Sequence, residues 1–210
     1  MFNVKRTKIN FDVKKYYSTK IVDELEKIFY GKCYLCEDKA GNINIEHLVP
    51  HKGNPELKYD WNNLYYSCSR CNEIKHEQTN ILDCCNENID VFKAIKCLCT
   101  TDKNGYIFVE AQNKDNETIN TANLLNRCYN EKDTSTRRIS QTYLYNKIND
   151  ERSKFVDQCN ILLDNSYSDT EKLEAKQELI EMTEISYPFS VFWKWHILSD
   201  NELLKIYNGK

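Results

Sequence analysis

The 210-residue sequence has little proline or glycine and no long apolar run. Its three Pro and five Gly argue against a linker-rich, collagen-like or repeat chain. No stretch approaches the roughly 18 apolar residues that a membrane span requires. The first residues, MFNVKRTKINFDVKK, carry charge but lack the apolar segment of a secretory signal. We therefore expect a cytoplasmic protein of one domain or two small ones.

The sequence also lacks an excess of basic residues. Its 29 Lys and Arg against 32 Asp and Glu give a formal net charge of −3, whereas stand-alone nucleic-acid binders usually carry a basic surplus. The charge is uneven: the charged residues within 1–20 are mostly basic, and those within 169–202 are mostly acidic. We expect any phosphate-facing surface to lie toward the N-terminal half.

Cysteine is the residue that the sequence has in unusual number, with ten. In a chain without an export signal, this favours metal ligands or free core thiols over disulfides. The segments CYLC (33–36) and CSRC (68–71) form two CxxC pairs. Two such turns present four thiolates tetrahedrally, which is the geometry of structural zinc. The predicted zinc ligands are Cys33, Cys36, Cys68 and Cys71.

The other six cysteines have no regular spacing. Four of them could form a second zinc site, the alternative being separate thiols: Cys84, Cys85, Cys97 and Cys99. The last two, Cys128 and Cys159, are expected in helices or loops without a metal.

The hydrophobic pattern predicts an α+β fold. An apolar stripe ending at Gly31 predicts a first helix over 18–30. Downstream we expect two short strands, a short helix, a β-hairpin with an Asn104-Gly105 turn, and a helical C-terminal third in which Ser168 and Ser199 open capping boxes. The two strands are expected at 43–49 and 64–67 and the short helix at 70–76. The hairpin strands are expected at 94–99 and 106–111, and the longest C-terminal helix at 139–163.

Three of the four histidines lie inside the cysteine frame or directly after it. His47 ends a predicted strand beside Glu46, where it can take a proton from water. Asn72 and His76 are four residues apart and share a face of the predicted helix. That face could hold a divalent metal against a phosphate, and a metal with a base is what phosphodiester hydrolysis requires.

These residues resemble a known motif. Glu46-His47, Asn63 and Asn72, framed by two CxxC pairs, resemble the HNH nuclease motif on a ββα-metal fold, with Asn72 in place of the final histidine. The longer segment IEHLVPHKGNPELKYDWNNLYYSCSRCNEIK resembles the HNH component of Septu-type anti-phage defence systems, the PtuB-like proteins, some of which are retron-associated.

The resemblance implies a role for each motif residue. His47 would be the general base, and Asn63 would brace the loop that carries it. Glu46 and Asn72 would hold a catalytic Mg²⁺ or Mn²⁺, with His76 as a further candidate ligand. Two more residues, His51 and Lys75, are candidates for contact with nucleic acid, against the alternatives of a plain loop histidine and a solvated lysine.

We therefore expect a metal-dependent HNH endonuclease with structural zinc that cleaves nucleic acid as the effector of an anti-phage defence complex. DNA is the expected substrate. Two alternatives stay open: an HNH ribonuclease acting on tRNA or other RNA, and a non-catalytic zinc-ribbon binding module. The resemblance implies a PtuA-like ABC/SMC-type ATPase as partner. The expected parts are a basic arm and helix (1–31), the nuclease core (32–80), and a hairpin and helical region for partner docking (81–210).

Overall fold

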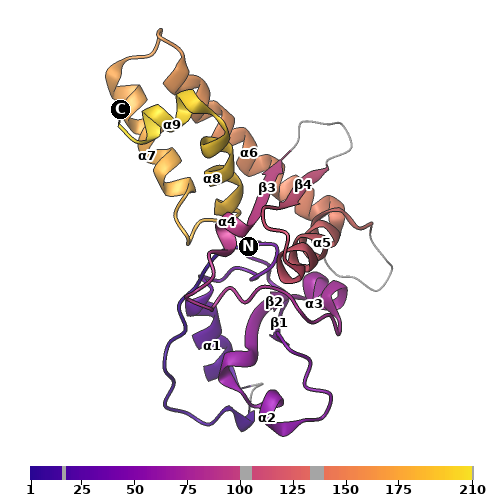
Figure 1. Ribbon diagram of the computed structural model, residues 1–210. Helices are drawn as coiled ribbons and strands as arrows, with labels where there is room; N and C mark the ends of the chain where they lie inside the picture. Colours follow the sequence, from indigo (N-terminus) through magenta and orange to yellow (C-terminus); the bar gives the residue numbers. More distant parts are fainter. Residues whose placement is uncertain (16–17, 100–105, 133–139, 210) are drawn as a thin grey trace.

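The computed structural model describes residues 1–15, 18–99, 106–132 and 140–209. Figure 1 shows the first helix and strand pair at one end of the molecule and the last four helices at the other. The predicted mixed α/β character is confirmed. The helices and strands are α1 (Thr19–Ile28), β1 (Ile43–His47), α2 (Pro55–Lys58), β2 (Leu64–Cys68), α3 (Ser69–Lys75), α4 (Val91–Ala94), β3 (Ile95–Cys99), β4 (Ile107–Ala111), α5 (Asn116–Asn130), α6 (Gln141–Leu163), α7 (Asp169–Met182), α8 (Ser190–Ser199) and α9 (Asn201–Tyr207).

Helix α1 forms where the apolar stripe predicted it. Ile21, Leu25 and Ile28 recur at helical spacing and are buried. The helix ends because Tyr30 and Gly31 both adopt positive φ, 56° and 68°, which turns the chain sharply toward the first CxxC pair.

Strands β1 and β2 pair antiparallel, with Ile43 opposite Cys68 and His47 opposite Leu64. Helix α3 follows β2 directly and packs against both strands. Strand β2 is buried along its whole length. This unit therefore holds the end of β1, where Glu46 and His47 lie, against α3, which carries Cys71 of the second CxxC pair.

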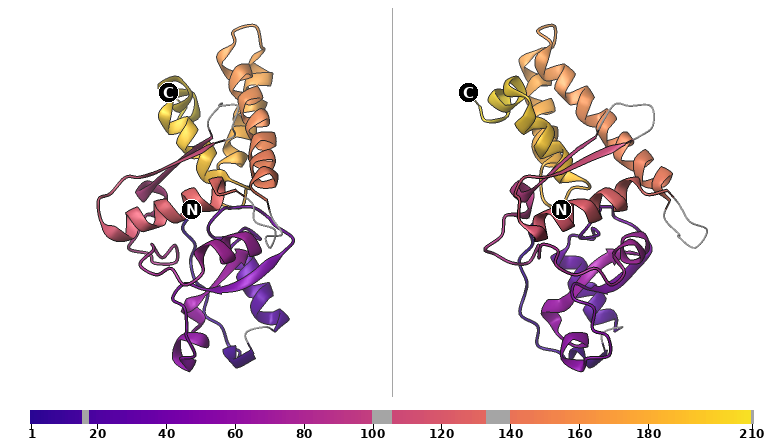
Figure 2. Two further views of the ribbon diagram at one scale, coloured as in Figure 1. Left: turned by 90° about the vertical axis from the view of Figure 1, so that its right-hand side faces the viewer. Right: turned by 45° about the vertical axis from the view of Figure 1, so that its right-hand side comes forward.

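The hairpin predicted downstream consists of β3 and β4, which pair antiparallel from Ile95–Ala111 to Cys99–Ile107. Its predicted Asn104-Gly105 turn lies outside the described residues, as does residue 139 at the predicted start of the long helix. Helices α6 and α7 pack as a pair that projects from the rest of the chain (Figure 2).

One of the two predicted capping boxes is confirmed. Ser168 caps α7 and exchanges hydrogen bonds with Glu171. Ser199 caps nothing: it is the last residue of α8, and the Asp200 side chain caps α9 by accepting from two backbone N–H groups. Helix α5 and the short helices α2 and α4 were not predicted.

The first residues of the chain pack into the core. Met1, Phe2 and Val4 are buried, and they belong to one hydrophobic cluster that continues to Leu203. The Arg6 guanidinium carbon lies 4.5 Å from the centre of the Tyr65 ring. The division into three parts at residues 31 and 80 stays a prediction.

The aromatic residues near the C-terminus belong to the hydrophobic core. Phe189, Phe192 and Trp193 are buried, and Tyr187 and Trp195 pack partly buried against them. None of the helices in the described part of the chain is both long enough and apolar enough to cross a membrane.

Candidate active site and metal centre

The four predicted zinc ligands come together in the structure. Their Sγ atoms all lie within 4.8 Å of one another and all four side chains are buried. The Sγ atoms of Cys36 and Cys68 are 3.8 Å apart. Four sulfurs at about 2.3 Å from a tetrahedral zinc would be separated by roughly 3.8 Å. The cluster is therefore shaped to bind a metal such as zinc.

Local backbone geometry supports the same conclusion. Glu37 adopts a φ of 61°, and its N–H donates to the Cys33 carbonyl at 2.9 Å, which closes the first turn. In the second turn, the Cys71 N–H donates to Cys68 Sγ at 3.4 Å. Burial raises the pKa of a thiol, but hydrogen bonds from Cys36, Cys68 and Cys71 hold the pKa of Cys33 well below its ordinary value.

The remaining cysteines do not form the second zinc site considered above. Among the described residues, Cys84 and Cys85 group with Asp83, and Cys97 and Cys99 are not in that group. No spacing in the sequence places Cys128 of α5 near the metal centre, but a hydrogen bond with Cys128 raises the pKa of Cys71. The Cys128 thiol therefore lies beside the four-cysteine cluster as a fifth sulfur.

His47 is held by a backbone carbonyl. Its Nε2 lies 3.1 Å from the carbonyl oxygen of Lys58 in α2. A carbonyl only accepts hydrogen bonds, so this contact places the imidazole proton on Nε2 and the lone pair on Nδ1. Burial lowers the pKa of His47, which favours the neutral ring at pH 7. The ring thus has the charge state that a general base needs.

Asn63 ties together the two loops around His47. Its Oδ1 accepts from the Val49 N–H at 2.8 Å, and its Nδ2 donates to the carbonyls of Val49 and Leu57 at 2.8 and 2.9 Å. Asn63 is buried. The side chain therefore fixes the chain directly after His47 and the helix whose carbonyl holds the ring.

Glu46 and Lys75 form a buried ion pair. The Lys75 Nζ lies 2.7 Å from Glu46 Oε1 and also donates to the His47 carbonyl at 2.8 Å. Lys75 is 1% exposed, which contradicts the expectation that it contacts nucleic acid. Burial raises the pKa of Glu46, and the lysine opposes that rise. Glu46 therefore faces a lysine with one oxygen, an arrangement that the sequence did not predict.

A shallow hollow of about 300 Å³ lies over these residues. Asn72 is half-buried on α3 and is not part of its lining. His76 is exposed there but is not helical: α3 ends at Lys75, and His76 has a φ of 47°, so the expectation that Asn72 and His76 share a helix face is wrong. The lining residues are Glu46, His47, Pro50, His51, Lys52, His76 and Glu77.

His51 is the second histidine of the hollow. Its ring centre lies 4.8 Å from that of His47, edge to face. Its Nδ1 accepts a hydrogen bond of 3.0 Å from the Gly53 N–H. The remaining N–H is therefore on Nε2, and the ring can donate a hydrogen bond from that atom.

Residues 33–78 match the HNH endonuclease family. They form an HNH endonuclease domain. The match begins at the first CxxC cysteine and runs through Glu46, His47 and His76. A search of curated proteins found no match for the chain. A match to this family implies that residues 33–78 act on nucleic acid as a nuclease, and HNH nucleases use divalent metals.

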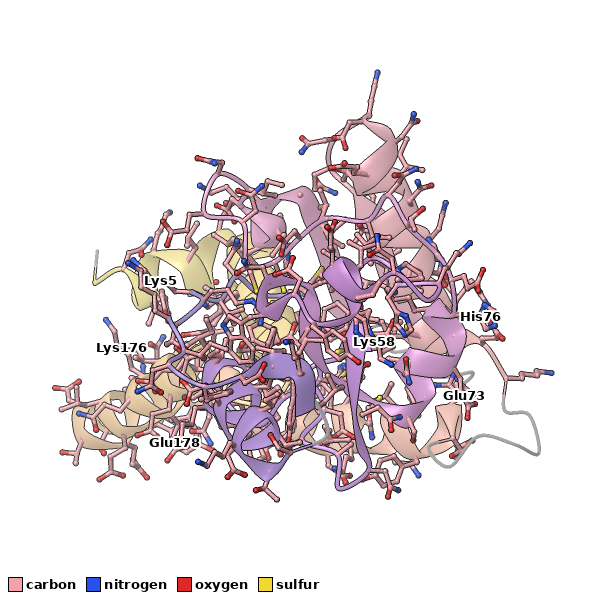
Figure 3. The ribbon with its side chains drawn as sticks, turned by 90° about the horizontal axis from the view of Figure 1, so that it is seen from below. Lys5, Lys58, Glu73, His76, Lys176 and Glu178 are labelled. Atoms are coloured by element: carbon pink, nitrogen blue, oxygen red, sulfur yellow. The ribbon has the colours of Figure 1, made fainter. Side chains whose placement is uncertain are left out.

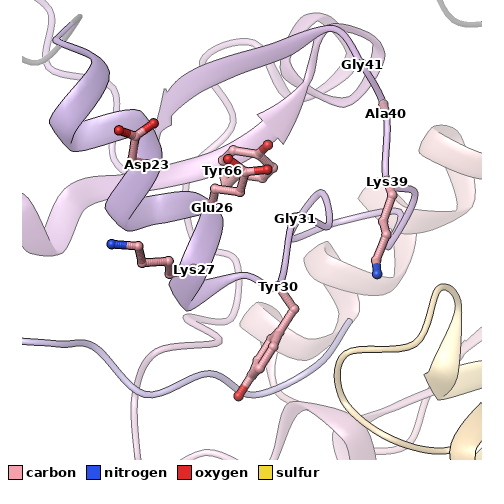
Figure 4. A pocket seen from close by; sticks show the side chains of 9 residues that line it. All are labelled: Asp23, Glu26, Lys27, Tyr30, Gly31, Lys39, Ala40, Gly41 and Tyr66. Carbon is pink, nitrogen blue, oxygen red and sulfur yellow. The ribbon is translucent and has the colours of Figure 1, made fainter.

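A larger hollow elsewhere has no histidine that could act as the general base. It lies between α1 and the chain that follows the first CxxC pair (Figure 4). Two acidic and two basic side chains line it together with two tyrosines, but it contains no histidine or cysteine: Asp23, Glu26, Lys27, Lys39, Tyr30 and Tyr66. The hollow over His47 is therefore the candidate active site.

Proposed function

We propose that residues 33–78 catalyse metal-dependent hydrolysis of phosphodiester bonds with His47 as the general base. The observation that carries the proposal is the hydrogen bond from His47 Nε2 to the Lys58 carbonyl. It leaves the lone pair on Nδ1 of a neutral imidazole, which can take the proton from an attacking water molecule. Asn63 supports this role because it fixes both loops that position the ring.

The divalent ion would be held by residues at the edge of the same hollow. Glu46 offers a carboxylate and His76 an imidazole, and both line the hollow; Asn72 is included on the family resemblance. These donor types suit Mg²⁺ or Mn²⁺. When bound, the ion polarises the phosphate and stabilises the leaving oxygen. The four-cysteine cluster would hold structural zinc.

Nuclease assays on the full chain test this proposal. Zinc-loaded protein is incubated with plasmid DNA and, in parallel, with tRNA, with Mg²⁺ or Mn²⁺ added; we propose DNA as the substrate. We expect His47→Ala to lower the cleavage rate by 10²-fold or more, the usual range for a general base. His196 in α8 lies away from the hollow, and His196→Gln serves as the matched histidine control. Unchanged cleavage by His47→Ala would remove His47 from the mechanism.

We further propose that the nuclease is the effector of an anti-phage defence complex with a PtuA-like ABC/SMC-type ATPase. The Septu-type resemblance supports the partner. The net charge of −3 supports it as well, because such a chain gains little non-specific affinity for a polyanion. Seen from below, His76 lies at the edge of the molecule opposite Lys176 and Glu178 of acidic α7, and Lys58 lies between them (Figure 3).

Because α7 is acidic, it should repel nucleic acid. We therefore propose α7 as the surface that binds the protein partner. The chain alone should then cleave weakly at physiological salt. Cleavage that rises on addition of the ATPase supports the complex, and full activity of the isolated chain counts against it.

A further inference from the structure

We propose that Lys75 is a positioning residue that fixes the Glu46 carboxylate relative to the His47 backbone, and so orients Glu46 toward the catalytic ion. This inference rests on the proposed function. It concerns an interior contact that the family match does not assign.

The contact joins two elements at their ends. Lys75 is the last residue of α3, and Glu46 and His47 are the last two residues of β1. The single Nζ atom donates to Glu46 Oε1 at 2.7 Å and to the His47 carbonyl at 2.8 Å. One ammonium group therefore fixes both a side chain and the backbone of the next residue.

Burial makes this contact specific. The Lys75 side chain is 0% exposed and the Glu46 side chain 11%. A buried ammonium keeps its charge only where acceptors satisfy it. Its tetrahedral N–H groups can reach two acceptors in different planes, whereas the planar guanidinium of an arginine aims its donors in one plane. A lysine therefore suits these two acceptors better than an arginine does.

Glu46 lines the hollow, and its carboxylate accepts hydrogen bonds from Lys75 Nζ, at Oε1, and from the His47 backbone. Each carboxylate oxygen has two lone pairs, so a carboxylate oriented by these donors can still bind an ion at the hollow. Hydrogen bonds to a ligating carboxylate fix its orientation, and their loss typically weakens metal binding by about 10–100-fold. The tie to the His47 carbonyl keeps the base in register with that carboxylate.

The test measures Mn²⁺ binding to the zinc-loaded full chain by electron paramagnetic resonance, without nucleic acid. We expect Lys75→Met and Glu46→Gln each to raise the Mn²⁺ dissociation constant about 10-fold or more. The double variant should bind little worse than either single variant, because both changes remove the same oriented oxygen. Zinc content and circular dichroism are recorded for each variant.

Lys147→Met is the matched control. Lys147 pairs with buried Asp38 at 2.8 Å, away from the hollow. This variant should lose stability but keep wild-type Mn²⁺ affinity. If Lys75→Met does not fold, Lys75→Arg replaces it; the planar group should retain the fold and bind Mn²⁺ more weakly than the wild type.

Three results would overturn the proposal: wild-type Mn²⁺ affinity in the folded Lys75 variants, a change confined to their melting temperature, or no Mn²⁺ binding by the wild type. Cleavage is assayed separately on the same preparations. Its absence from the wild type would count against the nuclease function, while the comparison of Mn²⁺ affinities still decides the role of Lys75.

Discussion

Lys32 Nζ donates a hydrogen bond of 3.0 Å to the carbonyl oxygen of Tyr187, although the two residues are 155 positions apart in the sequence. Lys32 directly precedes Cys33 of the metal centre, and its Nζ also lies 3.2 Å from Glu37 and 3.3 Å from Ser190 Oγ. Both charged side chains are completely buried. The chain directly before the first CxxC pair is thus bonded to the chain around the start of α8.

This network makes Glu37 a large contributor to stability. Glu37→Gln would leave the buried charges of Lys32 and of the Met1 amino group, which lies 3.2 Å from Glu37, without a counter-charge. We expect the free energy of unfolding to fall by about 3–5 kcal/mol, measured by urea denaturation of zinc-loaded protein. Glu87, paired with Lys5 on the surface, is the control: Glu87→Gln should cost less than about 1 kcal/mol. Equal losses would disprove the role of the buried pair.

Zinc should be required for folding of the nuclease domain. We expect one zinc per chain by elemental analysis, its loss in Cys36→Ala, and cooperative unfolding of residues 33–78 when a chelator is added, because binding energy at such a site is folding energy. Cys159→Ala, which removes a thiol outside both cysteine groups, should keep its zinc. A chelated chain with an unchanged circular dichroism spectrum would contradict this prediction.

Asn63 can be tested against its neighbour. Asn63→Ala removes three hydrogen bonds and leaves the Val49 and Leu57 groups unpaired, so we expect about 1–3 kcal/mol of destabilisation and a clear loss of cleavage. Asn62→Ala changes an adjacent, exposed side chain and should affect neither quantity. Thermal melts and cleavage rates measured side by side give the result; equal behaviour of the two variants would remove the bracing role.

His196 should make the protein sensitive to mild acid. Burial, assisted by the charge of Arg152, lowers the pKa of His196 to about 4, and its Nε2 accepts from the Cys99 N–H. The unfolded side chain has a pKa of about 6.5, so unfolding takes up a proton between these values. Stability should fall as pH drops from about 6.5 toward 4, by at most about 1.4 kcal/mol per pH unit from this group. His196→Gln should flatten the slope in urea titrations at several pH values.

The rate of cleavage should depend on pH through His47. Because its folded pKa lies below the ordinary 6.5, the neutral base persists into weak acid. We expect the acidic limb of the rate profile to have its midpoint below pH 6.5, and to be absent from the residual activity of His47→Ala. A midpoint above pH 7 would assign the limb to another group.

The parts of this structure that the sequence predicted are those governed by local rules. The stripe of α1 and the positive-φ Gly31 define a helix and its end without any tertiary information. The two CxxC spacings likewise fix which sulfurs can converge, and all four did.

The parts that it did not predict depend on tertiary packing. Helix α5 buries Thr118, Thr121, Ala122 and Cys128 beside Leu124, Leu125 and Tyr129. More than half of its buried positions are therefore small or polar residues, which do not stand out as core positions in the sequence. Lys75 reads as a solvated lysine because nothing local shows that its acceptors lie on β1. Ser199 and Asp200 are both good capping residues, and only the end of α8 decides between them.

The buried contacts around the CxxC pairs limit how this nuclease domain can be inherited. Between the second pair, Arg70 is fully buried and donates at 2.9 Å to the Cys128 carbonyl in α5, while Asp38 beyond the first pair binds Lys147 of α6. A gene fusion that moved residues 33–78 alone would separate these charged groups from their partners in α5 and α6. Recombination should therefore spread this domain only together with its helical scaffold, so its descendants would keep both halves as one heritable unit.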